Sequence, residues 1–185
     1  NVQFLSIKYL ESDACMRICC GTQRSFTIHV VDATNQEVIR VSREFKFCAG
    51  NSCCAGCCDC CAHEITVSSP DGSVFGYVKQ KGSFIRPKFD ILDESHEPVL
   101  KLEGPFCILD GPCFPGNQQF RLLTLDGKTQ IGKLQKEYAG FVREMVSSAD
   151  RFGIEFPVDL SVKTKATLIG ALFLIDFMFF ERKQK

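Results

Sequence analysis

The 185-residue sequence has no tryptophan and three tyrosines, so its 17 phenylalanines supply most of the aromatic surface. It also has no excess of charge of either sign, because the formal net charge is +0 at pH 7. A neutral chain has no overall field to attract nucleic acid or anionic lipid. Nucleic acid is therefore not an expected partner, and any membrane affinity must be local. The phenylalanines indicate either a thick core or a lipid-facing surface.

Two further absences concern targeting and catalysis. The chain opens without the basic start and apolar run of a secretory signal peptide, so despite its 12 cysteines we expect a reducing, cytosolic environment. It contains no serine–histidine–aspartate arrangement, phosphate-binding glycine loop or His-x-x-His pair. His29, His63 and His96 are isolated in the sequence, which points away from an enzyme, and we name no catalytic residue.

A repeated strand pattern dominates the chain, whose length and apolar content of 45% indicate one globular domain over residues 1–185. Four segments alternate apolar and polar residues on either side of a polar turn, as β-hairpins do. Asp71-Gly72 and Asp126-Gly127 supply the positive φ angles that such turns need. Repeated hairpins predict a large antiparallel sheet, which must close or be covered. The four segments are Phe26 to Val41, Ile65 to Val78, Phe89 to Leu102 and Phe120 to Leu134.

The C-terminal part of the chain predicts a hydrophobic helix over residues 163–181 that is apolar on every side. Its apolar run from Ala166 to Phe180 is shorter than the about 20 residues that a membrane span needs. A carboxylate such as Asp176 costs about 2.5–3.5 kcal/mol at the centre of a lipid-exposed helix. Burial inside the protein explains the all-round apolarity equally well. Both a core helix and a single span stay open, and the candidate membrane helix is marked by Ala166, Gly170, Asp176 and Phe180.

Six cysteines occupy the nine positions from Cys53 to Cys61, inside a cysteine-rich segment over residues 48–61. Neighbouring cysteines would need separate partners at bonding distance, which argues against a disulfide staple. A metal site is a second interpretation, because the string Cys54-x-x-Cys57-x-x-Cys60 has iron–sulfur spacing and Cys48 or His63 could complete the set. The sequence lacks, however, the second, separated Cys-x-x-Cys pair with which zinc sites clamp two parts of a chain.

Two other interpretations of these cysteines stay open. Free cysteine behaves readily as a small hydrophobe in a strand or loop. Clustered cytosolic thiols near a membrane are also the usual acceptors of acyl chains, and more than one chain is what makes membrane attachment stable. S-acylation alone makes use of the number of thiols. We therefore predict S-acylation at Cys53, Cys54, Cys57, Cys58, Cys60 and Cys61.

The segment from Ser148 to Asp159 can be laid over a twelve-residue calcium-binding loop, with Gly153 where that loop turns. Few of the ligand positions carry charge, so a Ca²⁺ site would be weak, with a dissociation constant of about 10⁻⁴–10⁻³ M. The alternating apolar residues are also what a strand produces, and the pattern favours the strand. The candidate calcium ligands are Ser148, Asp150, Phe152, Ile154, Phe156 and Asp159.

Several motifs together resemble the phospholipid scramblase family over nearly the whole chain. The matching strings are Cys57-Cys58-Asp59-Cys60-Cys61, Phe75-Gly76-Tyr77-Val78, Asp150 to Pro157 and Lys165 to Glu181. The resemblance implies a membrane protein that moves phospholipids between leaflets in response to calcium and without ATP. It also implies palmitoylation at the cysteines and calcium binding at the segment that ends in Asp159.

The family's fold is similar to the tubby domain, which implies a mainly β, closed antiparallel barrel around the C-terminal hydrophobic helix. We expect membrane association at the cytoplasmic face, with the plasma membrane as the expected site and a single-pass topology as the alternative. The expected partners are membrane phospholipids and other proteins, with oligomerisation on calcium binding. A rival hypothesis is an acyl-anchored module that binds phosphoinositides or proteins and moves no lipid.

Overall fold

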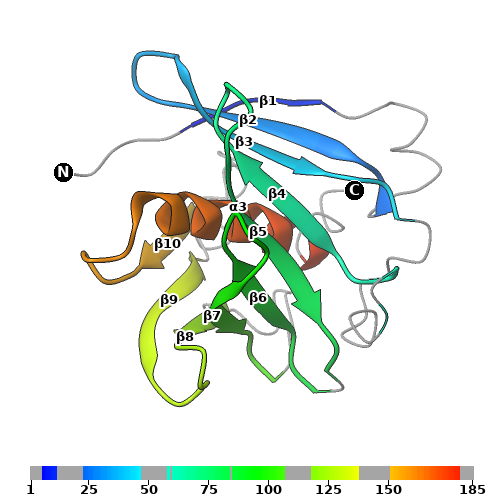
Figure 1. The fold of residues 1–185 in the computed structure, drawn as a ribbon, viewed down its shortest axis with the longest axis vertical. Helices are drawn as coiled ribbons and strands as arrows, with labels where there is room; N and C mark the ends of the chain where they lie inside the picture. The colour runs from blue at the N-terminus through cyan, green and yellow to red at the C-terminus, as the bar shows by residue number, and fades with distance from the viewer. Residues whose placement is uncertain are drawn as a thin grey trace, which may run out of the picture.

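The computed structural model describes residues 6–11, 23–46, 58, 60–83, 85–106, 118–137 and 151–179. Ten strands in this part of the chain form one antiparallel sheet, in which the spatial order is the chain order. Helix α3 (Val162–Phe179) follows the last strand (Figure 1). The strands are β1 (Ser6–Glu11), β2 (Phe26–Val31), β3 (Glu37–Arg43), β4 (Glu64–Ser68), β5 (Val74–Lys81), β6 (Lys88–Leu92), β7 (Pro98–Glu103), β8 (Gln118–Leu123), β9 (Gln130–Glu137) and β10 (Arg151–Glu155).

The four predicted hairpins are confirmed as β2–β3, β4–β5, β6–β7 and β8–β9. Asp32 and Asp93 begin two of the turns and accept hydrogen bonds from backbone N–H groups within them. Because these contacts are local, the turns can be predicted from the sequence. Strand β1 lies outside the four predicted segments. In each turn one residue has a positive φ angle: Asn35, Gly72, His96 and Gly127.

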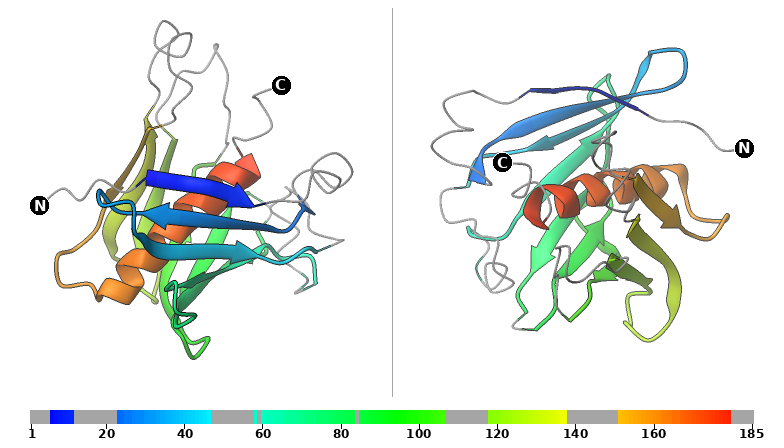
Figure 2. Two further views of the ribbon diagram at one scale, coloured as in Figure 1. Left: turned by 90° about the horizontal axis from the view of Figure 1, so that it is seen from above. Right: turned by 180° about the vertical axis from the view of Figure 1, so that it is seen from behind.

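Helix α3 lies in the hollow of the curved sheet, against β4, β5 and β6 (Figures 1 and 2). Nine of its residues are buried, and they occur on more than one side of the helix, as all-round apolarity predicts. Two glycines set the close approach of helix and sheet. A Cβ at Gly170 would clash with Val67 Cγ2, and one at Gly76 would clash first with the Leu92 carbonyl oxygen of β6 and would also lie 2.8 Å from Thr167 Oγ1. Larger side chains at these points would push α3 away from the sheet.

Aromatic rings and arginines enclose the C-terminal end of α3. The ring of Phe177 lies 4.6 Å from that of Phe26, centroid to centroid. The guanidinium groups of Arg24 and Arg43, both buried, lie 4.6 and 5.0 Å from the Phe177 centroid. The helix has no basic residue in its own last turn, and this end carries the negative pole of the helix dipole. The two arginines therefore supply positive charge that the last turn of the helix lacks, besides their cation–π contacts.

The core-helix interpretation is confirmed, and the single-pass alternative is not supported. Leu168, Ala171 and Leu174 are fully buried, and Asp176 is half-buried and has a partner. In the described residues, no helix combines the length and apolarity that crossing a membrane requires. The described helix begins at Val162 and ends at Phe179, so Phe180 lies outside the described residues.

The mainly β class of the fold is confirmed, but closure of the sheet is not. Strands β1 and β10 are its two edges, and no pairing joins them within the described ranges. The sheet curls around α3 (Figure 2). The closed barrel therefore stays a prediction.

Candidate functional site

Three cysteine side chains converge where the chain enters β4. The Sγ atoms of Cys58 and Cys60 lie 2.9 Å apart, and those of Cys60 and Cys61 lie 3.6 Å apart. All three sulfur atoms are within 4.8 Å of one another. Cys58 and Cys60 are exposed, Cys61 is half-buried, and none of the three is in a disulfide. We call these three residues the thiol cluster.

The thiol cluster lies on a tight turn that is followed by two buried residues. The N–H groups of Cys61 and Ala62 both donate to the carbonyl oxygen of Cys58, at 3.0 and 2.9 Å. Ala62 and the next residue, His63, are fully buried. The His63 N–H donates to Gln80 Oε1 at 3.2 Å, and its carbonyl oxygen accepts from the Gln80 N–H at 2.7 Å. Strand β5 therefore holds the residues that carry the exposed thiols.

Hydrogen bonding within the thiol cluster makes Cys58 more acidic. The hydrogen bond between the Cys60 side chain and Cys58 lowers the pKa of the Cys58 thiol below its usual value. The thiolate, rather than the thiol, is the nucleophile and the metal ligand in cysteine chemistry. This arrangement therefore favours both attack on an acyl donor and binding of a soft cation.

The predicted acylation set falls only partly within the described structure. Cys53, Cys54 and Cys57 lie outside the described residues, as does Cys48. His63 is buried and does not join the group of converging thiols. The described sulfur atoms that come together are those of Cys58, Cys60 and Cys61, whereas the iron–sulfur spacing was that of Cys54, Cys57 and Cys60. Acylation stays a prediction.

The candidate calcium segment is partly a strand. Strand β10 pairs in register with β9 over all five of its residues. Gly132 of β9 permits this approach, because a Cβ there would clash with the carbonyl oxygen of Glu155. The strand interpretation is confirmed for Phe152 and Ile154, and Phe156 is half-buried and packs against the core.

The remaining calcium candidates are separated from this strand. Asp159 lies in an exposed turn between β10 and α3, whereas Ser148 and Asp150 lie outside the described residues. Gly153 pairs with Gln135 in the sheet instead of turning a loop. A strand advances about 3.3 Å per residue, whereas a calcium loop wraps alternate residues around one ion. A twelve-residue loop would therefore require β10 to leave β9, and calcium binding stays a prediction.

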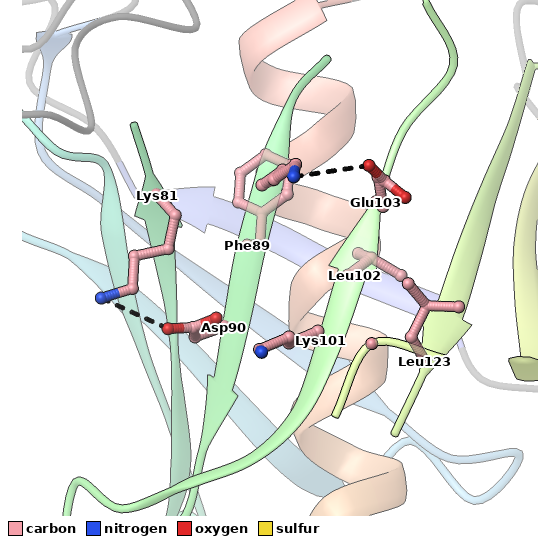
Figure 3. A pocket seen from close by; sticks show the side chains of 9 residues that line it. Lys81, Phe89, Asp90, Lys101, Leu102, Glu103 and Leu123 are labelled. Carbon is pink, nitrogen blue, oxygen red and sulfur yellow. Dashed lines mark ion pairs between the residues drawn. The ribbon is translucent and has the colours of Figure 1, made fainter. Parts of the chain in front are cut away.

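A groove of about 540 Å³ lies on the outer face of β5, β6 and β7 (Figure 3). Two ion pairs line it: Lys81 Nζ is 3.4 Å from Asp90 Oδ2, and Lys88 Nζ is 3.6 Å from Glu103 Oε1. The exposed side chain of Lys101 lies beside Asp90, on the neighbouring strand (Figure 3). We call this feature the charged groove.

The charged groove carries a net positive charge. Its lining has three lysines against two carboxylates, an excess of one. Arg121 of β8 adds a further cation beside it and donates to Glu103 Oε2 at 2.5 Å. Cross-strand register builds the feature, since it sets Asp90 opposite Lys101 and Glu103 opposite Arg121. The groove was not among the predicted sites, although the alternating charges of Lys88-x-Asp90 and Lys101-x-Glu103 are its signal.

Together these features define a class of domain: a curved antiparallel sheet around a buried apolar helix, with thiols and a charged groove on the outside. The Scramblase family model matches residues 1–182. The chain therefore belongs to the scramblase family.

Relatives in this family carry names that refer to phospholipids. The chain is 44% identical over 171 residues to phospholipid scramblase 1 of Homo sapiens, covering 92% of this chain and 51% of that protein. It is 44% identical over 172 residues to phospholipid scramblase 2 of Homo sapiens, covering 93% and 55%. Phospholipid scramblase 4 of Homo sapiens is 36% identical over 180 residues, covering 97% and 52%. The chain thus spans about half the length of these relatives, and no solved structure matches it.

Proposed function

We propose that the protein moves phospholipids between the two leaflets of a membrane without consuming ATP. The observation that carries the proposal is the family match over residues 1–182, together with relatives named phospholipid scramblases. The sequence contains no phosphate-binding glycine loop for a nucleotide. A process that only equilibrates lipids between leaflets needs no such site.

Acyl chains on the cysteine-rich segment form the principal membrane attachment in this proposal. The support is the exposure of Cys58 and Cys60 and the lowered pKa of the Cys58 thiol. Helix α3 is buried against the sheet, and its apolar side chains are taken up by that packing. Two or more acyl chains give stable attachment, whereas one gives only reversible contact. The attachment side is the cytoplasmic face, with the plasma membrane as the proposed site.

Calcium regulates lipid movement in this proposal through the segment that ends in Asp159. The support is the exposure of Asp159 in the turn between β10 and α3. Because β10 is paired along its length, calcium binding by Asp150 and Asp159 together would act by detaching β10 from β9. Detachment makes binding weak, since the lost pairing opposes it. It also exposes the edge of β9 to a second copy, so oligomerisation would follow calcium binding.

Lipid movement in vesicles tests the proposal. The acylated, purified chain is placed in sealed vesicles with a fluorescent phospholipid, and the fraction reached by an external quencher is followed with and without Ca²⁺. We expect movement that Ca²⁺ accelerates, and Asp159→Asn to reduce the acceleration. Glu44→Gln is the matched control, because Glu44 is another exposed carboxylate outside this segment.

The outcomes separate the parts of the proposal. Equal acceleration by Ca²⁺ in the native chain and in Asp159→Asn would remove Asp159 from the calcium site. Absence of lipid movement under every condition would reject the transport activity.

A binding module without transport activity is the second candidate, and the charged groove favours it. Its size and net positive charge suit the phosphate of an anionic headgroup, and Lys101 is an exposed cation in its lining. The test is co-sedimentation of the unacylated chain with phosphatidylcholine vesicles that contain or lack a phosphoinositide. We expect binding to the first set that weakens as salt is added. Equal sedimentation with both sets would reject headgroup recognition.

A further inference from the structure

The thiol cluster brings together three soft ligands within the reach of one ion. Its three sulfur atoms lie within 4.8 Å of one another, although the residues are nearly adjacent in the chain. Adjacent side chains in an extended strand point to opposite faces, so the turn that closes on the Cys58 carbonyl oxygen produces the convergence. The buried Ala62 and His63 fix the far side of that turn.

We propose that the thiol cluster is a three-thiolate site for a soft metal ion, and that Cu⁺ is the ion that fits it best. Thiolate ligands select Cu⁺, Zn²⁺ and iron–sulfur clusters over hard cations such as Ca²⁺ and Mg²⁺. The number of ligands decides among these. Within the described residues, no histidine or carboxylate joins the three sulfurs.

Zinc and iron–sulfur clusters need more ligands than this group offers. Structural Zn²⁺ is almost always bound by four protein ligands in a tetrahedron, and iron–sulfur clusters are held by four cysteines. His63, the nearest histidine in the chain, is fully buried and hydrogen-bonded through its backbone to Gln80. Cu⁺ is satisfied by two or three thiolates, so the three described sulfur atoms supply a complete coordination shell for it.

Binding converts three thiols to thiolates and releases three protons. Three bonds form between Sγ atoms and the ion, and no electron is transferred when the metal is supplied as Cu⁺. The site then carries two negative charges, from three thiolates and one monovalent cation. Affinity therefore rises with pH, because protons compete with the metal for sulfur.

The metal competes with acylation for the same sulfur atoms. A thioester sulfur is no longer a thiolate, so an acylated cysteine in the cluster cannot complete the three-thiolate site. Metal occupancy would accordingly keep these three thiols out of the acyl anchor and leave the anchor to Cys53, Cys54 and Cys57. This regulatory consequence rests on the proposed acyl anchor, whereas metal binding itself depends neither on acylation nor on lipid movement.

Competition for Cu⁺ tests the site directly. The full chain is produced without acylation, reduced and loaded with Cu⁺ in the absence of oxygen. It is then titrated with a chromophoric Cu⁺ chelator, whose absorbance gives the amount of Cu⁺ that the chelator has taken and therefore the amount that the protein keeps. The test variant replaces Cys58, Cys60 and Cys61 with serine. The matched control replaces Cys53, Cys54 and Cys57 with serine, which removes the same number of thiols from the same segment. Equal thermal unfolding of the two variants shows that any difference is local.

We expect the test variant to lose one bound equivalent of Cu⁺ and the control to keep it. X-ray absorption of the loaded native chain should report three sulfur neighbours around the metal. Loss of the equivalent in both variants, or in neither, overturns the assignment to the thiol cluster. Retention of Zn²⁺ in preference to Cu⁺ overturns the choice of ion. In either case the vesicle experiment on the acylated chain is unaffected, so failure of this inference is distinguishable from failure of the proposed function.

Discussion

The two faces of one sheet differ in what they present. Toward α3, strands β6 and β7 direct apolar side chains that are buried: Phe89, Ile91, Leu100 and Leu102. Away from α3, the same strands direct the side chains of the charged groove: Lys88, Asp90, Lys101 and Glu103. Because successive residues of a strand point to opposite faces, the same short strands supply both the apolar inner face and the charged outer face.

This difference indicates which surfaces of the protein are available to contact a membrane. The hydrophobic helix α3 packs against the inner face of the sheet. In the proposed function, contacts with lipid are made by the outer face, through charge, and by the thiol cluster, through its acyl chains. We therefore expect changes on the inner face to alter stability and changes on the outer face to alter binding.

The largest effect should come from truncation of a buried helix residue. Leu174 is 0% exposed, and Leu174→Ala should lower the free energy of unfolding by about 2–5 kcal/mol. Val162→Ala is the control in the same helix, because Val162 is 82% exposed. Urea denaturation measures both. An unchanged unfolding free energy in Leu174→Ala would place this side of α3 outside the core.

A smaller effect is expected where helix and sheet meet at glycine. The added methyl group of Gly170→Ala clashes with Val67, and overpacking costs about 1–3 kcal/mol. Alanine regains about 0.8–1.0 kcal/mol of helix propensity, so we expect a net loss of about 1 kcal/mol. Gly153→Ala is the matched control, because a Cβ there meets nothing within 4 Å. Denaturation that leaves Gly170→Ala as stable as the control would show that α3 can shift away from β4.

The hairpin turns should make stability fall in acid. Hydrogen bonds from Thr34, Ser73 and Thr124 respectively lower the pKa of three turn carboxyl groups below the usual value. A pKa that is lower in the folded state gives stability above the unfolded value of about 3.9, and this stability disappears as pH falls through the folded pKa. The three groups belong to Asp32, Asp71 and Asp126.

Unfolding free energies at about pH 5 and about pH 3 measure this loss. Replacing the three aspartates with asparagine keeps an acceptor oxygen in each turn and removes the titration. The difference between the two pH values should then shrink. An undiminished difference would assign the acid sensitivity to other carboxyl groups.

The smallest effect on stability should come from the charged groove. Lys101→Glu should lower the free energy of unfolding by only about 0.2–1 kcal/mol, because Lys101 is exposed and the new carboxylate would face Asp90 across the strands. The same change should weaken binding to vesicles with anionic headgroups. Lys163→Glu applies the same charge change at the start of α3, where Lys163 pairs with Glu94. Equal weakening by both variants would show that net charge, rather than the groove, drives binding.

How far the fold follows from sequence depends on how local each feature is. The hairpins are predictable because a two-residue period and turn residues such as Asp71-Gly72 and Asp126-Gly127 act over a few positions. The place of α3 is not, because an apolar helix looks the same in lipid and inside a sheet. Its burial depends on Gly76 and Gly170, whose role appears only once helix and strand are packed.

The candidate sites follow the same rule. The cysteines are conspicuous in the sequence, but which of them converge is set by one turn at Cys58. The charged groove depends on register, since Asp90 faces Lys101 only in the paired strands. The strand in the calcium segment is predictable from the alternation of Phe152 and Ile154, whereas its pairing along β9 is a long-range contact.

The position of α3 in the chain has a consequence for synthesis. All ten strands precede the helix, and yet the helix fills the centre of their common core. While the chain is being made, the strands have no α3 to cover their apolar face until Val162 to Phe179 have emerged from the ribosome. The growing sheet therefore passes through a stage in which that face is open to chaperones or to other chains. The sheet gains its centre only when α3 arrives, so a chain that stopped at Ser161 would be a sheet without its centre.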